Sequence, residues 1–206
     1  MGFKLTDEEG IFLVKLARRA VEENLKDGRV ISPPRETPQK LMERCGVFVT
    51  LNKIHDGRKE LRGCIGFPYP TYPLAKAVIE VAISSATRDP RFNPVSPEEL
   101  NHITFEVSVL TPPELIEVEK PTEYPKMIKV GRDGLIIEHG YYKGLLLPQV
   151  PVEWGWDEEE FLCQCCIKAG LPPDYWLIKG TKVYRFQAII FEETEPRGEI
   201  VRRKLE

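Results

Sequence analysis

Residues 47–67, VFVTLNKIHDGRKELRGCIGF, contain two strand-like runs on either side of the dipeptide Asp56-Gly57. An Asp-Gly pair between alternating apolar residues is a strong signal for a two-residue turn that joins antiparallel strands. The sequence therefore predicts a hairpin with strands over residues 47–54 and 59–67. Its second strand is unusual, because the run LRGCIG combines a charge and a thiol with two glycines, and a covered strand normally contains neither a charge nor glycine.

Strand parity predicts which side chains of the hairpin lie together. Counting outward from the turn places Val49 opposite Cys64. Arg62 and Gly66 have the same parity as Cys64, so these three positions are expected to share one face. Large apolar residues occur on both predicted faces, so the hairpin should be covered on both sides. A covered Arg62 needs a carboxylate, carbonyl groups or an anionic ligand, and Glu106 is the first partner to test.

The thiol of Cys64 is the reactive group of this run. A thiol two residues from a guanidinium on the same strand face has its thiolate form favoured, which suits a nucleophile or a metal ligand. Gly63 and Gly66 allow another backbone or a ligand to approach closely. A packing explanation stays open beside the functional one, because cysteine is a small side chain that is often buried and glycines also mark β-bulges.

Composition points to a folded protein of the cytoplasm. The chain has 206 residues, of which 42% are hydrophobic, and a net charge of −3. No apolar run approaches the roughly 20 residues that span a bilayer, and acids precede the first apolar run, which is the reverse of a secretory signal. We interpret the basic run at 202–204 as a solvent-exposed chain end. The sequence therefore does not favour nucleic acid or a membrane as a partner. We therefore expect a cytoplasmic location.

Cysteine and charge content add two further expectations. Five cysteines in a cytoplasmic chain of this size are expected to be thiols rather than disulfides. Cys163 and Cys166 have C-x-x-C spacing in a predicted helix, but no second pair at zinc spacing follows, so we expect buried core thiols and neither a metal nor a cofactor. A charged fraction of 30% with 18 prolines is typical of a heat-adapted source.

Helices and strands are predicted along the rest of the chain. Thr6 and Glu9 have the spacing of a capping box, and apolar residues continue at helical spacing to Leu25 before Gly28 ends the pattern. Further helices are predicted over residues 74–87 and 157–169, an alternating strand over 103–109, three short strands between 127 and 150, and a last strand over 183–191. Hairpin-linked strands with helices between them indicate an antiparallel α+β protein.

Two connectors divide the chain. The segments near 111–125 and 171–181 are rich in turn residues and bracket a stretch with its own strands and helix. We therefore expect a smaller lobe of about residues 116–179, inserted into a larger lobe of about residues 1–115 and 180–206.

Several longer runs occur in a characteristic order. They are LRGCIG, DPRFNP, EVSVL, GLLLPQV and the KAGL that ends a cysteine-bearing helix. Together they closely resemble the AMMECR family, named for a chromosomal region associated with Alport syndrome, midface hypoplasia and elliptocytosis. The resemblance covers nearly the whole chain. It implies an α+β fold of two unequal subdomains, each with an antiparallel sheet, and a cleft between them that the six-residue motif faces.

The resemblance also indicates site residues and a pathway. Carried over residue by residue, it makes the cleft-facing set Leu61, Arg62, Gly63, Cys64, Ile65 and Gly66. It supplies no established biochemical activity. Bacterial and archaeal members are associated with Memo-like and radical-SAM proteins, which implies a shared pathway but no particular chemistry for this chain.

Other polar residues are candidates for the same site. Arg88, Asp89 and Arg91 lie in one proline-containing loop and could bind an anion or pin the subdomains together. His102 and His139 could serve as bases toward the thiol of the motif if folding brings them within hydrogen-bond reach. A lone histidine at a strand edge is more often a surface residue.

Two functions are compatible with these residues. The first is a binding module whose cleft takes up a protein segment or another sizeable ligand, with Arg62 orienting a carboxylate or carbonyl group. The second is an enzyme with Cys64 as nucleophile, Arg62 favouring its thiolate and a histidine as base. Such an enzyme needs a base near the thiol and a third group that orients the base, and the sequence displays no such set. The sequence therefore favours binding.

Overall fold

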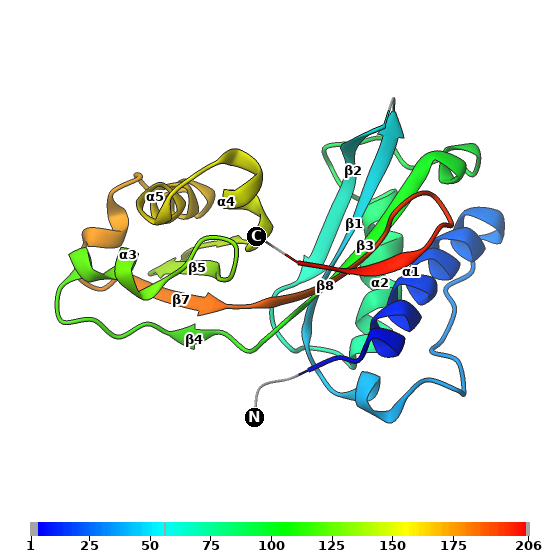
Figure 1. Ribbon diagram of the computed structural model, residues 1–206, viewed down its shortest axis with the longest axis horizontal. Helices are drawn as coiled ribbons and strands as arrows, with labels where there is room; N and C mark the ends of the chain where they lie inside the picture. The colour runs from blue at the N-terminus through cyan, green and yellow to red at the C-terminus, as the bar shows by residue number, and fades with distance from the viewer. Residues whose placement is uncertain (1–3, 56, 205–206) are drawn as a thin grey trace. The chain divides into compact units, whose positions relative to one another are not determined.

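The computed structural model describes residues 4–55 and 57–204, which combine helices with two antiparallel sheets (Figure 1). They form two units, one of residues 4–110 and 189–203 and the other of residues 111–188 with Lys204. The predicted α+β class is confirmed. In the described part of the chain, no helix is both long enough and apolar enough to cross a lipid bilayer.

The first unit is built on a five-stranded sheet with the order β2-β1-β3-β8-β9. Its strands are β1 (Gly46–His55), β2 (Arg58–Phe67), β3 (Ile103–Leu110), β8 (Ala188–Glu193) and β9 (Ile200–Arg203). Its helices are α1 (Asp7–Asp27) and α2 (Leu74–Thr87), with the 3₁₀ turns η1 (Gln39–Met42) and η2 (Glu98–His102). The two α-helices pack together against one face of this sheet (Figure 1).

Helix α1 begins and ends at the residues that its capping signals predict. Thr6 Oγ1 accepts the Glu9 N–H at 3.2 Å, and the Glu9 carboxylate accepts the Thr6 N–H at 2.8 Å. Two otherwise unpaired donors of the first turn are thereby satisfied. At the other end Gly28 has a φ of 74°, a left-handed conformation that glycine adopts without strain.

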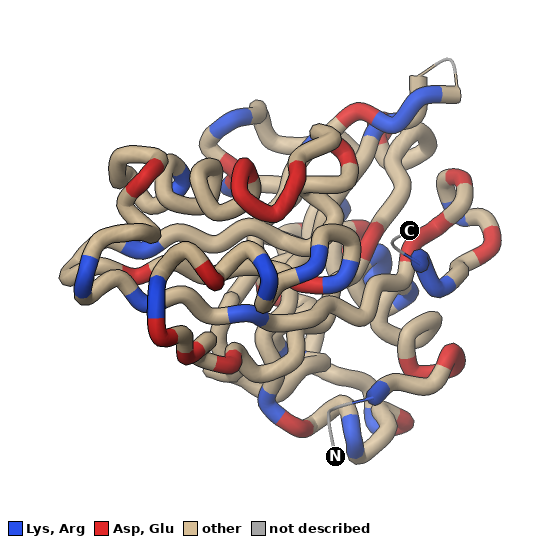
Figure 2. The backbone as a smooth tube through the Cα atoms, turned by 60° about the vertical axis from the view of Figure 1, so that its left-hand side comes forward, with Lys and Arg blue, Asp and Glu red and all other residues tan. Residues whose placement is uncertain are grey.

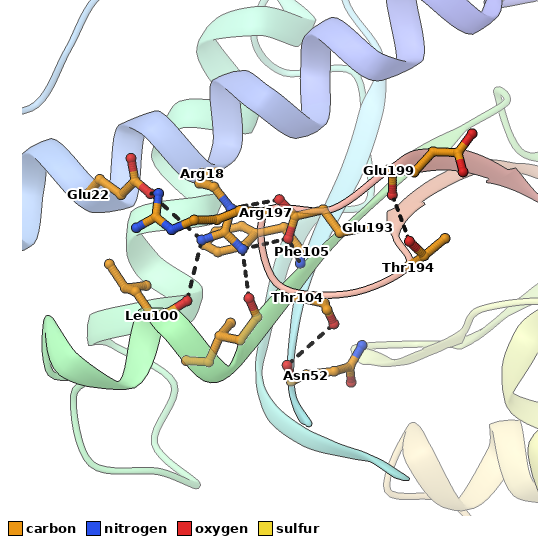
Figure 3. Close-up of polar contacts among 11 residues, drawn as sticks. Arg18, Glu22, Asn52, Leu100, Thr104, Phe105, Glu193, Thr194, Arg197 and Glu199 are labelled. Carbon is orange, nitrogen blue, oxygen red and sulfur yellow. Dashed lines mark hydrogen bonds and ion pairs between the residues drawn. The ribbon is translucent and has the colours of Figure 1, made fainter. Parts of the chain in front are cut away.

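A buried ion pair joins α1 to the sheet (Figure 3). Arg18 donates from Nε and Nη2 to the two carboxylate oxygens of Glu193, at 2.6 and 2.5 Å. Nη2 also donates to the Ile103 carbonyl at 2.6 Å, and the Phe105 ring lies 4.5 Å from the guanidinium carbon. Removing either charge would leave the other buried without its partner, which typically costs about 3–5 kcal/mol. The sequence analysis did not predict this pair.

The second unit is built on a four-stranded sheet with the order β4-β7-β5-β6. Its strands are β4 (Glu114–Leu115), β5 (Gly134–His139), β6 (Tyr142–Leu146) and β7 (Lys182–Phe186). Its helices and 3₁₀ turns are η3 (Pro121–Glu123), α3 (Tyr124–Met127), α4 (Gln149–Trp154), α5 (Glu158–Lys168) and η4 (Tyr175–Leu177). Helix α5, capped by Asp157 as predicted, packs on β5 and β6 around buried Phe161 and Leu162.

The region between residues 127 and 150 contains two strands, β5 and β6, instead of the three predicted. The first predicted strand is replaced by the end of α3 and by a turn. In this turn the Asp133 carboxylate accepts the Lys129 N–H at 2.9 Å. A side chain that satisfies a nearby backbone donor in this way favours a turn over a strand.

The last predicted strand, residues 183–191, is divided between the two sheets. The division falls at Gln187, whose N–H donates to Thr111 Oγ1 and whose carbonyl accepts the Thr111 N–H, both at 2.8 Å. The predicted solvated end at 202–204 is also wrong, because β9 extends to Arg203. Arg202 donates to Asp7 at 2.9 Å, so this basic residue forms an ion pair in the edge strand β9 and is not part of a solvated end.

Candidate functional site

The hairpin of β1 and β2 contains a β-bulge at Arg62. The predicted turn is confirmed by the pairing of the flanking residues His55 and Arg58, although Asp56 lies outside the described residues. The register then shifts by one, so that Thr50 rather than Val49 lies opposite Cys64. The predicted register beyond the bulge is therefore wrong. One added residue moves every later side chain of the strand to the other face.

The bulge separates the side chains of Arg62 and Cys64. Val49 is fully buried against the helices, whereas Cys64 pairs with Thr50 and not with Val49, so the prediction that Arg62 and Cys64 share one face with Val49 is wrong for Cys64. Cys64 lies on the face that points away from α1 and α2. We call the uncharged, half-buried residues of this face the motif face: Phe48, Thr50, Asn52, Cys64 and Gly66.

Arg62 is held by Glu99 rather than by the predicted Glu106. Its Nε and Nη2 donate to the two Glu99 carboxylate oxygens at 3.1 and 3.0 Å, and Lys53 Nζ lies 3.8 Å from the same carboxylate. The hydrogen bonds from Arg62 are the largest cause that lowers the pKa of Glu99. The Arg62 side chain is 13% exposed, and the Phe92 ring lies 5.8 Å from its guanidinium carbon. Arg62 therefore anchors β2 to the connection between α2 and β3.

Gly63 is required where α2 crosses β2. A Cβ atom at this position would lie 2.2 Å from the Ser85 carbonyl oxygen, which is closer than any real contact. Ser85 Oγ accepts the Ile65 N–H at 2.9 Å and lies 2.8 Å from the Val49 carbonyl oxygen. The hydroxyl group thus enters between paired residues of β1 and β2. The close approach that the glycine allows is that of the α2 backbone.

Gly66 is required for a different reason, within the motif face itself. A Cβ atom at Gly66 would lie 2.3 Å from Phe48 Cγ. The aromatic ring therefore packs directly on the glycine backbone of the neighbouring strand. Both glycines of the motif are explained by packing.

Asp89 and Arg91 hold the outer edge of β2 at Cys64. Asp89 Oδ2 accepts the Cys64 N–H at 2.8 Å, and Arg91 donates to both Asp89 oxygens at 2.9 and 2.7 Å and to the Cys64 carbonyl at 3.4 Å. Hydrogen bonds from Arg91 are the main cause that lowers the pKa of Asp89 to about 2. Asp89 and Arg91 thus fix β2 to a loop of the same unit, whereas the sequence analysis considered a contact that fixes the two subdomains to each other. Arg88 is exposed at the end of α2.

The thiol of Cys64 is half-buried and accepts a hydrogen bond from Thr50 Oγ1 at 3.3 Å. Burial is the largest cause that raises the pKa of this thiol, and Glu106 and Asp89 also raise it. Thr50 and Arg91 act in the opposite direction but do not reverse the shift. The thiol form is therefore favoured, whereas the sequence analysis expected a favoured thiolate.

Glu106 lies on β3 opposite Thr50 and is almost completely buried. Arg203 of β9 donates to Glu106 Oε2 at 3.0 Å, and Ser108 donates to Oε1 at 3.3 Å. The C-terminal strand thus supplies the cation for this carboxylate. Glu106 therefore lies on the same side of the sheet as Thr50 and Cys64, and its negative charge raises the pKa of the Cys64 thiol.

His102, the histidine candidate of the first unit, does not complete a catalytic set with Cys64 among the described residues. The polar partners of Cys64 are Thr50, Asp89 and Arg91. His102 is exposed at the end of η2. His139 belongs to β5 of the second unit, where its Nδ1 lies 2.9 Å from Thr181 Oγ1. Its neighbours are thus residues of its own unit.

The cysteines of α5 contribute to the core of the second unit. Cys165 and Cys166 are buried, and burial raises the pKa of Cys166 to about 11. Cys165 Sγ lies 3.6 Å from the Leu135 carbonyl oxygen, and Cys163 is half-buried. Across the described residues, no three His, Cys, Asp or Glu side chains are grouped so that they could hold a metal ion.

Sequence reasoning missed three residues that shape the site. Glu99 occurs three positions after Ser96, a spacing typical of a capping box, and it does accept the Ser96 N–H at 3.0 Å. That spacing identifies a turn, but it does not reveal that the same carboxylate also holds Arg62. Ser85 and Thr50 carry no local signal, because their partners are remote in sequence.

The family model AMMECR1 matches residues 14–191 of the chain. The chain belongs to the AMMECR1 family. A protein of Thermococcus gammatolerans is 63% identical over 204 residues, covering 98% of this chain and 99% of its own. Another, from Pyrococcus abyssi, is 64% identical over 203 residues and 98% of each chain. The resemblance stated from the sequence motifs is thereby confirmed.

A crystal structure of an uncharacterised protein from Pyrococcus horikoshii has the same fold. Its TM-score to the AMMECR1 protein described here is 0.94 at 63% sequence identity, covering 98% of this chain and 100% of the other. Thermophilic organisms are among the sources of these relatives, in agreement with the heat-adapted composition.

Proposed function

We propose that this AMMECR1 protein is a binding module whose motif face takes up a protein segment or another sizeable ligand. The observation that carries this proposal is that some groups of the motif fix the position of β2, whereas another, the Cys64 side chain, lies on the motif face. Arg62, Gly63 and the backbone of Cys64 hold β2 in place, whereas the Cys64 side chain is half-buried on the motif face, whose own residues are uncharged.

A rigid face of this kind suits binding. Two ion-pair networks and the Ser85 hydroxyl hold β2 against its neighbours, so the face loses little conformational entropy when a ligand binds. Phe48 supplies an aromatic anchor, and Thr50 and Asn52 supply polar groups for hydrogen bonds.

Arg62 has an indirect role in this proposal. Glu99 occupies its Nε and Nη2, and its Nη1 is buried without a hydrogen-bond partner among the described residues. The guanidinium therefore contributes by fixing the strand that carries Cys64. The direct contact with a carboxylate or carbonyl group expected from the sequence is replaced by this positioning role.

A cysteine-dependent enzyme is the second candidate, because Cys64 is only half-buried. A nucleophilic cysteine normally needs a lowered pKa or an adjacent base. The pKa of Cys64 is raised, and Thr50 donates to its sulfur instead of accepting its proton. Binding is the function that this geometry supports better.

The proposal is tested by placing a large charge on the motif face. Asn52→Arg should abolish retention of proteins that the wild-type chain captures from an extract of its source cells, because the new side chain covers the face. The same substitution at exposed Asn101, in η2, is the matched control. Captured proteins are quantified by mass spectrometry.

The two variants separate the proposal from its alternative. We expect Asn101→Arg to retain the wild-type set and Asn52→Arg to lose it, with equal melting temperatures. Identical capture by all three chains, or no specific capture by any, would count against a binding function for the motif face.

A further inference from the structure

Five large apolar side chains are exposed at one end of the second unit. Tyr141 is fully exposed, and Tyr142, Ile167 and Ile178 are 55%, 51% and 45% exposed. With Leu177, which is 39% exposed, they form the patch that we name the Tyr141 patch: Tyr141, Tyr142, Ile167, Leu177 and Ile178. Single exposed apolar residues are normal, but a cluster of them marks an interaction site.

Three segments of the unit meet to form this patch. They are the turn between β5 and β6, the end of α5, and the loop from η4 to β7. A Cβ atom at Gly170, after α5, would lie 3.8 Å from the Tyr142 ring, and one at Gly180 would lie 3.8 Å from His139 Cε1. The His139 ring also contacts Tyr175 of η4, with ring centroids 4.8 Å apart. The three segments that carry the patch are therefore neighbours in the folded unit although they are remote in sequence.

Positive charge surrounds the Tyr141 patch. Its segments carry four exposed lysines and two acids, a net charge of +2: Lys143, Lys168, Lys179, Lys182, Glu138 and Asp174. Lys143 pairs with Glu138, whereas Lys168, Lys179 and Lys182 form no ion pair within the described part of the chain. The chain as a whole has a net charge of −3, and residues of both signs are distributed over it (Figure 2). The excess of positive charge is thus specific to the end of the second unit that carries the Tyr141 patch.

His139 adds an oriented polar group to the patch. Thr181 Oγ1 donates its proton to the Tyr175 carbonyl at 2.8 Å, so the contact of 2.9 Å between Thr181 Oγ1 and His139 Nδ1 requires a proton on Nδ1. In the neutral ring Nε2 is then an acceptor. A fixed tautomer of this kind can accept an N–H from a bound backbone.

We propose that the Tyr141 patch docks an acidic segment of another protein, one that carries large apolar side chains between its carboxylates. Tyrosine is enriched in protein interfaces, where buried aromatic anchors give affinity and rim charges select the partner. Single-stranded nucleic acid fits less well, because three of the five apolar residues are aliphatic and offer no base stacking. Membrane anchoring normally uses a larger basic cluster.

The test uses a fluorescein-labelled 18-residue peptide of Glu, Leu and Phe with its apolar residues at helical spacing, and a second peptide with Lys in place of each Glu. Fluorescence anisotropy is measured with the full chain at low salt. The acidic peptide should bind at least about tenfold more tightly than the basic one. Both Tyr141→Ser/Tyr142→Ser and Lys168→Glu/Lys179→Glu should weaken its binding at least about tenfold.

Matched controls come from the first unit. Tyr72 is 40% exposed, and Lys26 occupies the last turn of α1 as Lys168 does in α5. Tyr72→Ser and Lys26→Glu should leave peptide binding unchanged, and circular dichroism should show that every variant is folded.

Three outcomes would overturn this inference. They are failure of the acidic peptide to bind, equal binding of the two peptides, and binding that the patch variants do not weaken. A uridine 12-mer and vesicles of phosphatidylglycerol are assayed in parallel. Loss of RNA or vesicle binding in the patch variants, without peptide binding by the wild type, would reassign the patch to that ligand.

Discussion

Cys64 combines partial exposure with a raised pKa, which favours its protonated form. Desolvation opposes the thiolate, and the carboxylates of Glu106 and Asp89 add repulsion. Thr50 is the nearest polar group and stabilises the sulfur as an acceptor. A cysteine in these surroundings serves as a compact, weakly polar contact surface better than as a nucleophile.

This chemistry predicts slow alkylation of Cys64. In a Cys163→Ser background, the pH midpoint of the iodoacetamide reaction should lie above the roughly 8.5 of a free thiol. Thr50→Val should raise the midpoint further, because it removes a hydrogen bond that lowers the pKa. Mass spectrometry of the labelled peptide follows the reaction, and a midpoint clearly below 8.5 would instead support the enzyme alternative.

Asp89 predicts a specific dependence of stability on pH. Its pKa is lowered to about 2 in the folded chain, so its carboxylate stabilises the fold above the unfolded pKa, and this contribution is lost as the pH falls toward 2. Asp89→Asn should therefore reduce the free energy of unfolding by about 1–2 kcal/mol at pH 7. The deficit should shrink between pH 4 and 2, as measured by urea denaturation.

Exposed Asp174 is the control for this comparison. Asp174→Asn should leave the free energy of unfolding within about 0.5 kcal/mol of the wild type at every pH. A deficit for Asp89→Asn that stays constant down to pH 2 would show that the charge of Asp89 is not what stabilises β2.

Strand β2 contains the irregularities that distinguish the candidate site from a regular hairpin. The bulge at Arg62, the Gly63 crossing and the Ser85 hydroxyl together set the parity of the residues that follow. Cys64 lies on the motif face only because of this irregularity. The site is therefore a property of the whole strand and its support by α2.

Gly63→Ala tests this support. The new Cβ atom would lie 2.2 Å from the Ser85 carbonyl oxygen, so β2 and α2 must separate, at an expected cost of about 3 kcal/mol or more. Gly57, with a φ of 73° and no heavy atom within 4 Å of an added Cβ, is the control. Gly57→Ala should cost only about 1–2 kcal/mol of backbone strain. Equal costs in chemical denaturation would contradict the close crossing.

Local sequence patterns predicted the helices, strands and turns better than they predicted the register of the hairpin. The turn after β1 and both caps of α1 depend on neighbouring residues, and the sequence displays them directly. The bulge at Arg62 depends on Ser85 and Glu99, which lie 23 and 37 positions away. A parity count assumes a regular ladder, so it placed Cys64 on the same face as Val49, whereas the bulge places it on the motif face.

At the scale of the whole molecule, the two sheets share one chain segment. Residues 182–193 form β7 of one sheet and β8 of the other, with Gln187 between them. The hydrophobic pattern alone cannot divide this run, because both halves are equally strand-like. Class and family were predicted correctly from composition and motif order, since neither depends on the register of a single strand.

The two units carry separate proposed surfaces. The motif face belongs to the first unit and the Tyr141 patch to the second. Their surroundings differ, because a buried carboxylate, that of Glu106, lies beside the motif face and is paired with Arg203, whereas exposed lysines surround the Tyr141 patch. We expect Asn52→Arg to leave binding of the acidic peptide unchanged, and this is checked in the anisotropy assay. Loss of peptide binding in that variant would show that the two surfaces are not independent.

The most direct test of the central claim is protection of Cys64 by the captured partner. The wild-type chain is treated with iodoacetamide at pH 8.5, alone and with saturating partner, and the labelling rates of Cys64 and Cys163 are compared. The account predicts that the partner slows labelling of Cys64 at least about tenfold and leaves the Cys163 rate unchanged, because the ligand covers the motif face. Equal labelling rates of Cys64 with and without the partner would contradict it.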